Sequence, residues 1–373
     1  MSRRNGKVIG AIGLRGFPHV MGGVERHCEQ LYPRLASLGF RLYICRRSNY
    51  LTEKSRCYKH ENIDFIDLWV PKQKHMEAIY HSFIGLILLK VKGVKVLHIH
   101  SFGPAIVAPI AKMLGFSVVM TYHLPNYYQG KWNNFDRLLL RMVENVACLF
   151  SDTVITVSKT NQTVIKENTG KDSVVIPNGV NLPAHIDSDI TSYHLTKKRF
   201  IFSACRFVPE KGVDLLLKAF NKLNTDWKLV IAGTADHVSK YSLDVFATAK
   251  KNSNIILPGF ITGAELDLFY SNAGIFVLPS FIEGQPIALL EAMSHGLPVV
   301  VSDIPAHREL EIEERCFFKS GDVNNLAEKL NEFMHDGKLL DSGRKYRELV
   351  SDKYNWDSIA LNTGKIFDIL FKK

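Results

Sequence analysis

A loop, a helix and a buried strand are predicted, in that order, by Pro279-Ser-Phe-Ile-Glu-Gly-Gln-Pro-Ile-Ala-Leu-Leu-Glu-Ala-Met-Ser-His-Gly-Leu-Pro-Val-Val-Val-Ser-Asp303. Pro286 suits the first helical position, because its fixed φ matches a helix and its missing N–H has no intrahelical partner there. Ile287–Met293 is then an apolar helix, which Gly296-Leu-Pro ends. Helix-strand units of this kind, repeated along a chain, build parallel sheets.

Two carboxylates, Glu283 and Glu291, stand in this stretch. Glu283 falls on the loop before the helix and Glu291 in its second turn, so both lie near the positive N-terminus of the helix. Free N–H groups at such an end suit a phosphate, and a carboxylate beside them can accept hydrogen bonds from sugar hydroxyls. The pair is compatible with a phosphate and sugar hydroxyls, and on its own it also suggests paired acids for acid–base catalysis. An ordinary buried helix-strand unit with two solvated acids is the alternative.

The rest of the chain alternates short β-branched runs with longer helical patterns, which is typical of parallel sheets with crossover helices. One series of strands begins at Val8–Ile12 and a second at Phe200–Ala204. We predict two doubly wound α/β domains, residues 1–184 and 185–354. Because ligands bind at the carboxyl ends of strands in such sheets, the cleft between the two domains is the expected site.

Positive charge is concentrated in the first half of the chain. Residues 1–185 hold 24 Lys and Arg against 12 Asp and Glu, while the remainder holds 23 against 25. The first half therefore suits an anionic partner such as nucleic acid, lipid headgroups or a phosphate-bearing substrate. A solvated basic surface is the alternative. Because the sequence lacks an aromatic-rich basic reading motif, no nucleic-acid partner is expected.

The chain is expected to be cytosolic. Its longest apolar run, Phe83–Leu89, is too short to span a bilayer. Its six cysteines are scattered without a Cys-x-x-Cys pair, which is typical of reduced thiols. Cations alternate with tyrosines from Arg46 to His60, a pattern that suits an anionic membrane surface or a phosphorylated acceptor. The first domain is therefore a candidate for peripheral contact with the inner face of the cell membrane, and a solvated loop is the alternative.

A loop follows the first strand of each predicted domain. In the first domain Gly22 and Gly23 precede a helix, and paired glycines let backbone N–H groups approach an anion, although a flexible turn is the alternative. In the second domain Arg206-Phe-Val-Pro-Glu-Lys211-Gly212 sets two cations at the carboxyl end of a strand. They suit a diphosphate, with an ordinary surface loop as the alternative. In the predicted fold Arg206, Lys211 and Glu283 all lie at strand ends.

Histidines and aspartates do not indicate a metal site. His98-Ile-His100 alternates on a strand, so both side chains point to one face, but no third ligand is visible and a structural role is favoured over zinc. Asp187-Ser-Asp189 lies in the polar linker, which argues against a metal. His123 stands at the carboxyl end of a strand, where it can hydrogen-bond a substrate or transfer a proton. An ordinary loop histidine is the alternative.

These motifs, in this order and over nearly the whole chain, resemble the retaining GT-B glycosyltransferases of family 4. The resemblance rests on Gly22-Gly23-Val-Glu25, Ser151-Asp-Thr-Val-Ile-Thr-Val-Ser158, Ile176-Pro-Asn-Gly-Val180, Arg206 with Glu210-Lys211-Gly212, Glu283 with Glu291, and Tyr354-Asn-Trp356. It implies two Rossmann-like domains, with the nucleotide-sugar held mostly by the second and the last helix, within 355–373, packed back on the first. The opening Gly-Leu-Arg-Gly-Phe-Pro is similar to bacterial members that build surface polysaccharides.

The resemblance also implies roles for single residues. Arg206 and Lys211 would bind the diphosphate, Glu283 the donor sugar and Glu291 the ribose hydroxyls, while Gly22 and Gly23 would line the donor side of the first domain and His123 would lie near the transferred sugar. Many relatives have glycine where this chain has Pro286, which lacks an N–H. The nearest backbone donors to the phosphate are then those of Ile287 and Ala288.

The function predicted is transfer of a sugar from a nucleotide-diphosphate donor to a saccharide or lipid-linked saccharide, with retention at the anomeric carbon, in the synthesis of a surface polysaccharide such as a lipopolysaccharide or capsule. Fixed cations and a helix N-terminus can stabilise the departing diphosphate without a metal or other cofactor. The leaving phosphate would take the proton of the acceptor. Two alternatives stay open: a GT-B epimerase that alters the nucleotide-sugar itself, and a non-catalytic sugar- or nucleic-acid-binding protein.

Overall fold

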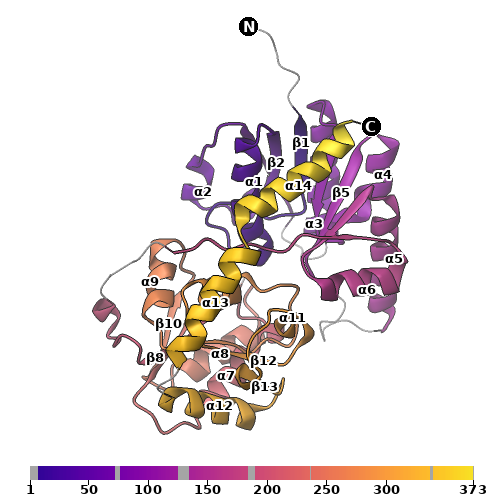
Figure 1. Ribbon diagram of the computed structural model, residues 1–373. Helices are drawn as coiled ribbons and strands as arrows, with labels where there is room; N and C mark the ends of the chain where they lie inside the picture. Colours follow the sequence, from indigo (N-terminus) through magenta and orange to yellow (C-terminus); the bar gives the residue numbers. More distant parts are fainter. Residues whose placement is uncertain are drawn as a thin grey trace. The chain divides into compact units, whose positions relative to one another are not determined.

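The computed structural model describes residues 7–71, 76–124, 134–183, 190–235, 237–336 and 339–372, and the chain forms two compact α/β units (Figure 1). Unit 1 comprises residues 1–178 and 356–373, and unit 2 comprises residues 179–355. The first division therefore falls at 178, earlier than the 184 expected from sequence. Val180 accounts for the difference, because it pairs with Asn355 and is buried in the core of unit 2.

Unit 1 is a seven-stranded parallel sheet in the order β3-β2-β1-β4-β5-β6-β7. Its strands are β1 (Val8–Ile12), β2 (Arg41–Arg47), β3 (Ile63–Leu68), β4 (Val96–His100), β5 (Ser117–Tyr122), β6 (Thr153–Thr156) and β7 (Val174–Val175). Its helices are α1 (Gly23–Ser37), α2 (Glu53–Cys57), α3 (Met76–Val91), α4 (Ala108–Met113), α5 (Asn134–Phe150), α6 (Lys159–Thr169) and α14 (Trp356–Phe371). One hydrophobic core joins the sheet to α1 and α14, and another joins it to α3, α4 and α5.

Helix α14 belongs to unit 1 although it follows all of unit 2 in the sequence (Figure 1). Its apolar stripe, which includes Trp356, Ile359 and Phe367, is buried against α1 and the sheet. An ion pair of 2.7 Å between Arg34 Nε and Asp357 Oδ1 joins the two helices. The last helix therefore packs on the first domain, as the resemblance implies.

Unit 2 is a six-stranded parallel sheet in the order β10-β9-β8-β11-β12-β13. Its strands are β8 (Phe200–Ala204), β9 (Lys228–Ala232), β10 (Ile255–Gly259), β11 (Ile275–Leu278), β12 (Val299–Ser302) and β13 (Phe317–Phe318). Its helices are α7 (Val213–Phe220), α8 (Lys240–Ala249), α9 (Ala264–Asn272), α10 (Ile287–Ser294), α11 (Pro305–Arg308), α12 (Val323–His335) and α13 (Leu339–Lys353). Because β8 and β11 are neighbours, the loops that follow them meet at one edge of the sheet.

The predicted fold class, two Rossmann-like parallel-sheet domains, is confirmed. The sequence patterns did not indicate α2, α13 or β13, because each is short or strongly polar. The polar linker around Asp187 and Asp189 is followed at once by buried side chains, because Ile190 and Leu195 lie in the core of unit 2. Asp187 and Asp189 lie outside the described residues.

Pro286 differs from its predicted place by one position. It precedes α10 with an extended backbone, ψ 108°, rather than occupying the first helical turn. Its carbonyl oxygen accepts from the N–H groups of Leu289 and Leu290, which is the role of an N-cap residue. Ile287 and Ala288 therefore present the first two N–H groups of the helix. In the described part of the chain, no helix is both long and apolar enough to cross a membrane.

Candidate active site

The loop after β8 packs against the loop after β11 and is hydrogen-bonded to it. The Phe281 N–H donates to the Glu210 carbonyl at 2.9 Å. Gly212, which ends the first loop, has φ +64° and ψ 29°, and a Cβ added there would lie 2.3 Å from the Pro279 carbonyl oxygen. Only glycine tolerates both this backbone conformation and this close approach. The sequence order Lys211-Gly212 therefore fixes the lysine beside the Glu283 segment.

Lys211 and Glu283 form an ion pair in this arrangement. Lys211 Nζ lies 2.6 Å from Glu283 Oε1, and the two side chains are 16% and 8% exposed. Ser280 Oγ donates to the same oxygen at 2.7 Å. Burial opposes ionisation of Glu283, but the charge of Lys211, the neighbouring His307 and the hydrogen bonds from Lys211 and Ser280 together hold the pKa of Glu283 below its usual value. The carboxylate is therefore ionised at neutral pH. Arg206 lies half-buried on the loop after β8, which also carries Lys211.

The N-terminus of α10 lies between Glu283 and Glu291 in the sequence. The N–H groups of Ile287 and Ala288 precede the first intrahelical bonds. Glu291 is half-buried on α10, and the hydroxyl of Tyr270 lies 3.3 Å from its Oε2 and 3.1 Å from the Ala288 carbonyl oxygen. A helix terminus flanked by carboxylates and a nearby lysine suits a phosphate and sugar hydroxyls on the same ligand.

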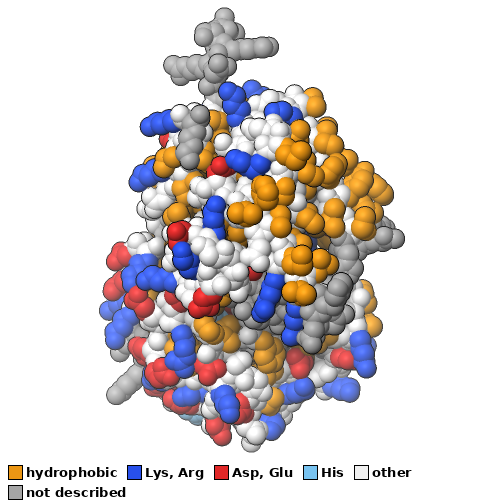
Figure 2. Space-filling view, turned by 90° about the vertical axis from the view of Figure 1, so that its right-hand side faces the viewer, with side chains coloured by type: hydrophobic (Ala, Val, Ile, Leu, Met, Phe, Trp, Pro, Cys, Tyr) orange, Lys and Arg blue, Asp and Glu red, His pale blue; other side chains and the backbone are white. Residues whose placement is uncertain are grey.

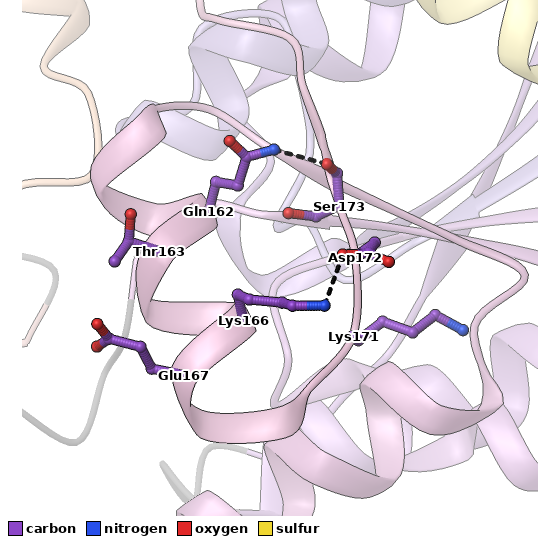
Figure 3. A pocket seen from close by; sticks show the side chains of 7 residues that line it. All are labelled: Gln162, Thr163, Lys166, Glu167, Lys171, Asp172 and Ser173. Atoms are coloured by element: carbon purple, nitrogen blue, oxygen red, sulfur yellow. Dashed lines mark hydrogen bonds and ion pairs between the residues drawn. The ribbon is translucent and has the colours of Figure 1, made fainter.

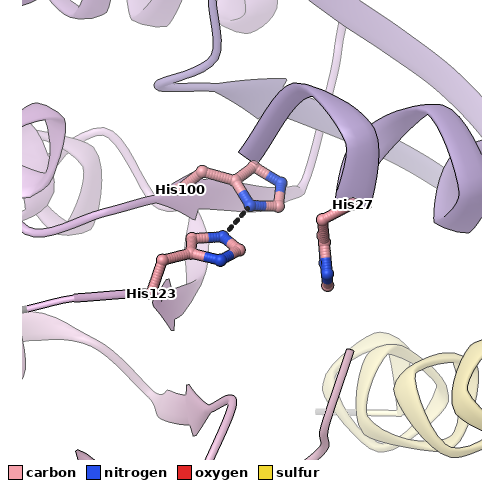
Figure 4. Close-up of side chains that lie close together, drawn as sticks. All are labelled: His27, His100 and His123. Atoms are coloured by element: carbon pink, nitrogen blue, oxygen red, sulfur yellow. Dashed lines mark hydrogen bonds between the residues drawn. The ribbon is translucent and has the colours of Figure 1, made fainter. Parts of the chain in front are cut away.

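Unit 1 gathers histidines at the carboxyl ends of β4 and β5 (Figure 4). His100 Nδ1 lies 3.0 Å from His123 Nε2, and the ring of His27, from α1, packs edge-on against both. His27 Nδ1 is 2.8 Å from Asn178 Oδ1, and its buried Nε2 has no hydrogen-bond partner among the described residues. Trp356 packs against the same ring. His27 thus contacts one residue from each of three sequence motifs: His100 of His98-Ile-His100, Asn178 of Ile176–Val180 and Trp356 of Tyr354-Asn-Trp356.

Tyr32 connects His98, the other histidine of β4, to the three-histidine cluster. Its hydroxyl lies 2.6 Å from His100 Nε2 and 3.0 Å from His98 Nδ1, so it donates to one ring and accepts from the other. His98 Nε2 in turn lies 2.7 Å from Thr121 Oγ1. Burial lowers the pKa of His98 to about 3, and it holds the pKa of His100 well below its usual value. These rings are neutral at pH 7 and act as hydrogen-bonding groups.

His98 and His100 do not form a ligand set of their own, but other histidines lie beside His100 that the sequence did not place there. His27 and His123 lie beside His100, and one ring nitrogen from each of these three residues lies within 4.8 Å of the others. Two nitrogens bound to one zinc ion at 2.0–2.1 Å are at most about 4.2 Å apart. The upper limit of 4.8 Å on the distances among the three nitrogens is close to this value, so the cluster is a candidate ion site, and an ion there would replace the His100–His123 hydrogen bond.

Gly22 and Gly23 begin α1 and differ from each other. Gly22 has φ +145°, and an added Cβ would lie 2.0 Å from Glu25 Oε2. Glu25 Oε1 accepts from the Arg15 N–H at 3.0 Å, so the carboxylate folds back over the start of its own helix. At Gly23 nothing lies within 4 Å of an added Cβ. The position of Gly22 therefore requires glycine, because a larger residue would collide with Glu25. At Gly23 the backbone at the start of α1 has no side chain packed over it.

The first cations of the basic segment Arg46–His60 are less exposed to a membrane or an acceptor than the sequence suggested. Arg46 is 2% exposed and binds Asp67 at 2.7 Å, while Arg47 binds Glu77 at 2.7 Å. Tyr50 also donates to Glu77. Neither a membrane-facing role nor a solvated loop therefore applies to Arg46 and Arg47, because both guanidinium groups are buried in ion pairs within unit 1.

A surface hollow of about 400 Å³ lies along α6 (Figure 3). It is lined by polar residues, and its lysines are engaged: Lys166 with Asp172 at 2.8 Å and Lys171 with the Ser151 carbonyl at 2.9 Å. None of the sequence-predicted site residues lines it. The hollow is therefore separate from both residue clusters described above.

Two Rossmann-like parallel-sheet units are the fold that the resemblance to the GT-B glycosyltransferases implies. Two family models match the chain: Glycosyltransferase Family 4 over residues 21–183 and Glycosyl transferases group 1 over residues 187–349. The chain belongs to the glycosyltransferases, with a first domain of the family 4 type and a second of the group 1 type.

Similar proteins span almost the same length. An uncharacterized glycosyltransferase of Methanocaldococcus jannaschii is 24% identical over 95% of this chain and 96% of its own. The UDP-Gal:alpha-D-GlcNAc-diphosphoundecaprenol alpha-1,3-galactosyltransferase of Escherichia coli is 26% identical over 94% of each chain. A sucrose-phosphate synthase from Thermosynechococcus elongatus has a TM-score of 0.86 at 22% identity, covering 98% of this chain and 99% of its own. That likeness concerns the fold alone.

Replacing Gly212 with alanine is expected to lower kcat/KM by about tenfold or more, because the new Cβ collides with the Pro279 carbonyl and moves Lys211. Gly170→Ala is the matched control: Gly170 has a similar backbone, φ +69° and ψ −4°, but nothing lies within 4 Å of an added Cβ. Both variants carry about 1 kcal/mol of backbone strain. Steady-state kinetics and melting temperatures check this, and equal losses of activity in the two would contradict the role given to Gly212.

Proposed function

We propose that the protein transfers a sugar, with retention at the anomeric carbon, from a nucleotide-diphosphate donor to a lipid-linked saccharide. The observation that carries the proposal is the Lys211–Glu283 pair, held by Gly212 against the loop that leads into α10. It sets a cation, an ionised carboxylate and a helix N-terminus within one small region of unit 2.

The donor would bind to that region through its charged and hydroxyl groups. Arg206, Lys211 and the N–H groups of Ile287 and Ala288 would bind the diphosphate, whose negative charge grows as the bond to the sugar breaks. Glu283 would accept hydrogen bonds from sugar hydroxyls and Glu291 from the ribose. We assign His123, whose carbonyl oxygen accepts from Asn161 Nδ2 at 3.0 Å, to the transferred sugar.

Retention is supported by the chemistry named in a relative. UDP-galactose carries its sugar in an α linkage, and the similar Escherichia coli protein is named for an alpha-1,3 product. For this chain we propose front-face attack, in which the leaving phosphate oxygen takes the proton of the acceptor hydroxyl as the new bond forms. The same relative is named for a diphosphoundecaprenol-linked acceptor, which supports a lipid-linked saccharide as acceptor. We propose that this transfer serves surface-polysaccharide synthesis at the inner face of the membrane.

Incubation with a panel of nucleotide-sugars tests the proposal. Release of nucleoside diphosphate only when a lipid-linked saccharide is present is the expected result. A new nucleotide-sugar formed without acceptor would show an epimerase. Binding of sugars without turnover, across donors and acceptors, would show a non-catalytic binding protein.

Turnover is expected to be unchanged after exhaustive chelation, because Arg206, Lys211 and the α10 N-terminus supply the charge that a metal would otherwise supply. The measurement is the initial rate before and after EDTA treatment, with added Mg²⁺ and Zn²⁺ as separate arms. A rate that falls on chelation and returns with Zn²⁺, but not in a His27→Ala variant, would instead assign an ion to the three-histidine cluster.

A further inference from the structure

One side of unit 1 exposes many large apolar side chains. Figure 2 shows hydrophobic side chains gathered on this side, which lies over helices α4 and α5 of Figure 1. Fifteen such residues come from α3, α4, α5 and the short turn η2 (Pro104–Val107), which packs against both α3 and α5. The most exposed on each helix are Val91 (79%), Met113 (86%) and Leu149 (71%). We call these fifteen side chains the α3–α5 face.

Helix α3 shows why the face is not ordinary surface. Its inner side packs into the core through Leu86 and Leu89, yet its outer side repeats apolar residues at helical spacing, including Ile79, Phe83 and Ile87. A helix that is apolar all round is normally buried by protein or lipid. Single exposed apolar residues are normal, but a contiguous patch on a monomer marks an interaction site.

The exposed charges of these helices are positive. Arg137 and Arg141 on α5 are exposed, as is Lys90 on α3, whose ammonium also donates to the Leu114 carbonyl. Apolar side chains with cations around them match the groups of an anionic bilayer, which offers acyl chains below and phosphate headgroups above.

Two of the three acids of the same helices are turned inward. Glu77 on α3 is 5% exposed and paired with Arg47. Glu144 on α5 is fully buried and accepts hydrogen bonds from Tyr122 and Asn168. The third acid, Asp136, is half-buried. The outward charge of the α3–α5 face is therefore complementary to anionic lipid.

We propose that the α3–α5 face docks the protein on an anionic lipid bilayer. The apolar side chains enter the interface and the cations of α3 and α5 bind headgroup phosphates. A symmetric contact with a second copy fits less well, because it would bring the basic residues of the two copies together. The inference rests on the proposed function in one respect: a lipid-linked acceptor is presented at such a surface.

Vesicle flotation tests the docking without any sugar substrate. The full chain is mixed with vesicles of phosphatidylcholine and phosphatidylglycerol, or of phosphatidylcholine alone, at low salt. We expect strong binding to the anionic vesicles and weak binding to the neutral ones. The variant Val91→Gln/Met113→Gln/Leu149→Gln is expected to lower binding to the anionic vesicles by about tenfold or more. Arg137→Gln/Arg141→Gln is expected to lower the partition coefficient roughly 30-fold.

Matched controls separate this face from general surface hydrophobicity. Val238→Gln/Leu243→Gln/Ile369→Gln removes three exposed apolar residues, 81%, 56% and 58% exposed, from elsewhere on the protein. This variant is expected to float as the unaltered protein does. Turnover with a short-chain, water-soluble acceptor is expected to be the same in all variants, so a failure of docking is distinguished from a failure of the proposed chemistry.

Three results would overturn the proposal: no binding of the unaltered protein to anionic vesicles, equal binding by the glutamine variant of the α3–α5 face, or a dimer in sedimentation velocity that this variant dissociates. The last result would assign the face to a second copy of the chain.

Discussion

Replacing Lys211 with alanine is expected to lower kcat/KM by about 10²-fold or more. In the proposed reaction the ammonium group faces the diphosphate as its negative charge grows, and loss of one such preorganised donor typically costs ~3–4 kcal/mol of transition-state stabilisation. Steady-state kinetics with the donor and acceptor identified by the panel provide the measurement. Turnover close to that of the unaltered enzyme would contradict the assignment of the site.

The ion pair requires a second variant to interpret this result. Without Lys211, the buried carboxylate of Glu283 has lost its charged partner, and such a loss costs about 3–5 kcal/mol of folding free energy. Lys211→Ala/Glu283→Gln removes that charge, so it is expected to regain thermal stability without regaining activity. Lys218→Ala removes an exposed lysine on α7 that pairs with Asp214 at 3.0 Å, and it is expected to change neither property.

Lowering the pH from 7.5 to 5 is expected to destabilise the protein steeply. Burial lowers the pKa of His27 and His307 to about 4 and that of His81 and His98 to about 3, and it holds the pKa values of His100 and His123 well below the usual range. The unfolded chain binds protons near pH 6.5, whereas the folded protein does not. Stability is therefore complete above pH 6.5 and falls as the pH decreases toward the folded-state values.

Each of these histidines contributes up to about 1.4 kcal/mol per pH unit in that window. Differential scanning calorimetry from pH 7.5 to 5 measures the effect, and unit 1 is expected to lose more than unit 2, because His307 is the one member of this set in unit 2. His81→Gln lies outside the three-histidine cluster and is expected to reduce the slope by one proton. A melting temperature that is flat between pH 6.5 and 5 would show that these rings titrate normally in the folded protein.

The group formed by Lys211, Glu283 and the start of α10 in unit 2 was largely predictable, because its signals are local in the sequence. Gly212 after Lys211, and Pro286 before an apolar run, each restrict the backbone within a few residues. The neighbouring positions of β8 and β11 then follow from the topology of doubly wound sheets. Ser280, His307 and Tyr270 were not predicted, because a serine, a histidine and a tyrosine near a strand or helix carry no specific signal.

The histidine cluster and the buried arginines of unit 1 could not be predicted from spacing. His27, His100 and His123 meet only because the fold brings the His27 ring of α1 beside the ends of β4 and β5. The sequence separations between them are too long for any local pattern. Arg46 was assigned to the surface because arginine is usually exposed. Its partner, Asp67, lies directly opposite it on β3, and the pairing register of two strands decides such a contact.

The path of the chain through α14 bears on how the protein is made. Unit 2 is continuous in sequence, so it can fold during translation as soon as residue 355 has left the ribosome. Unit 1 begins first but lacks the core contacts of Trp356, Ile359 and Phe367 until α14 has been synthesised. The nascent first half must therefore wait, with the apolar side chains that α14 covers still uncovered, while the whole of unit 2 is translated. Chaperone dependence during synthesis is expected to concentrate on that interval.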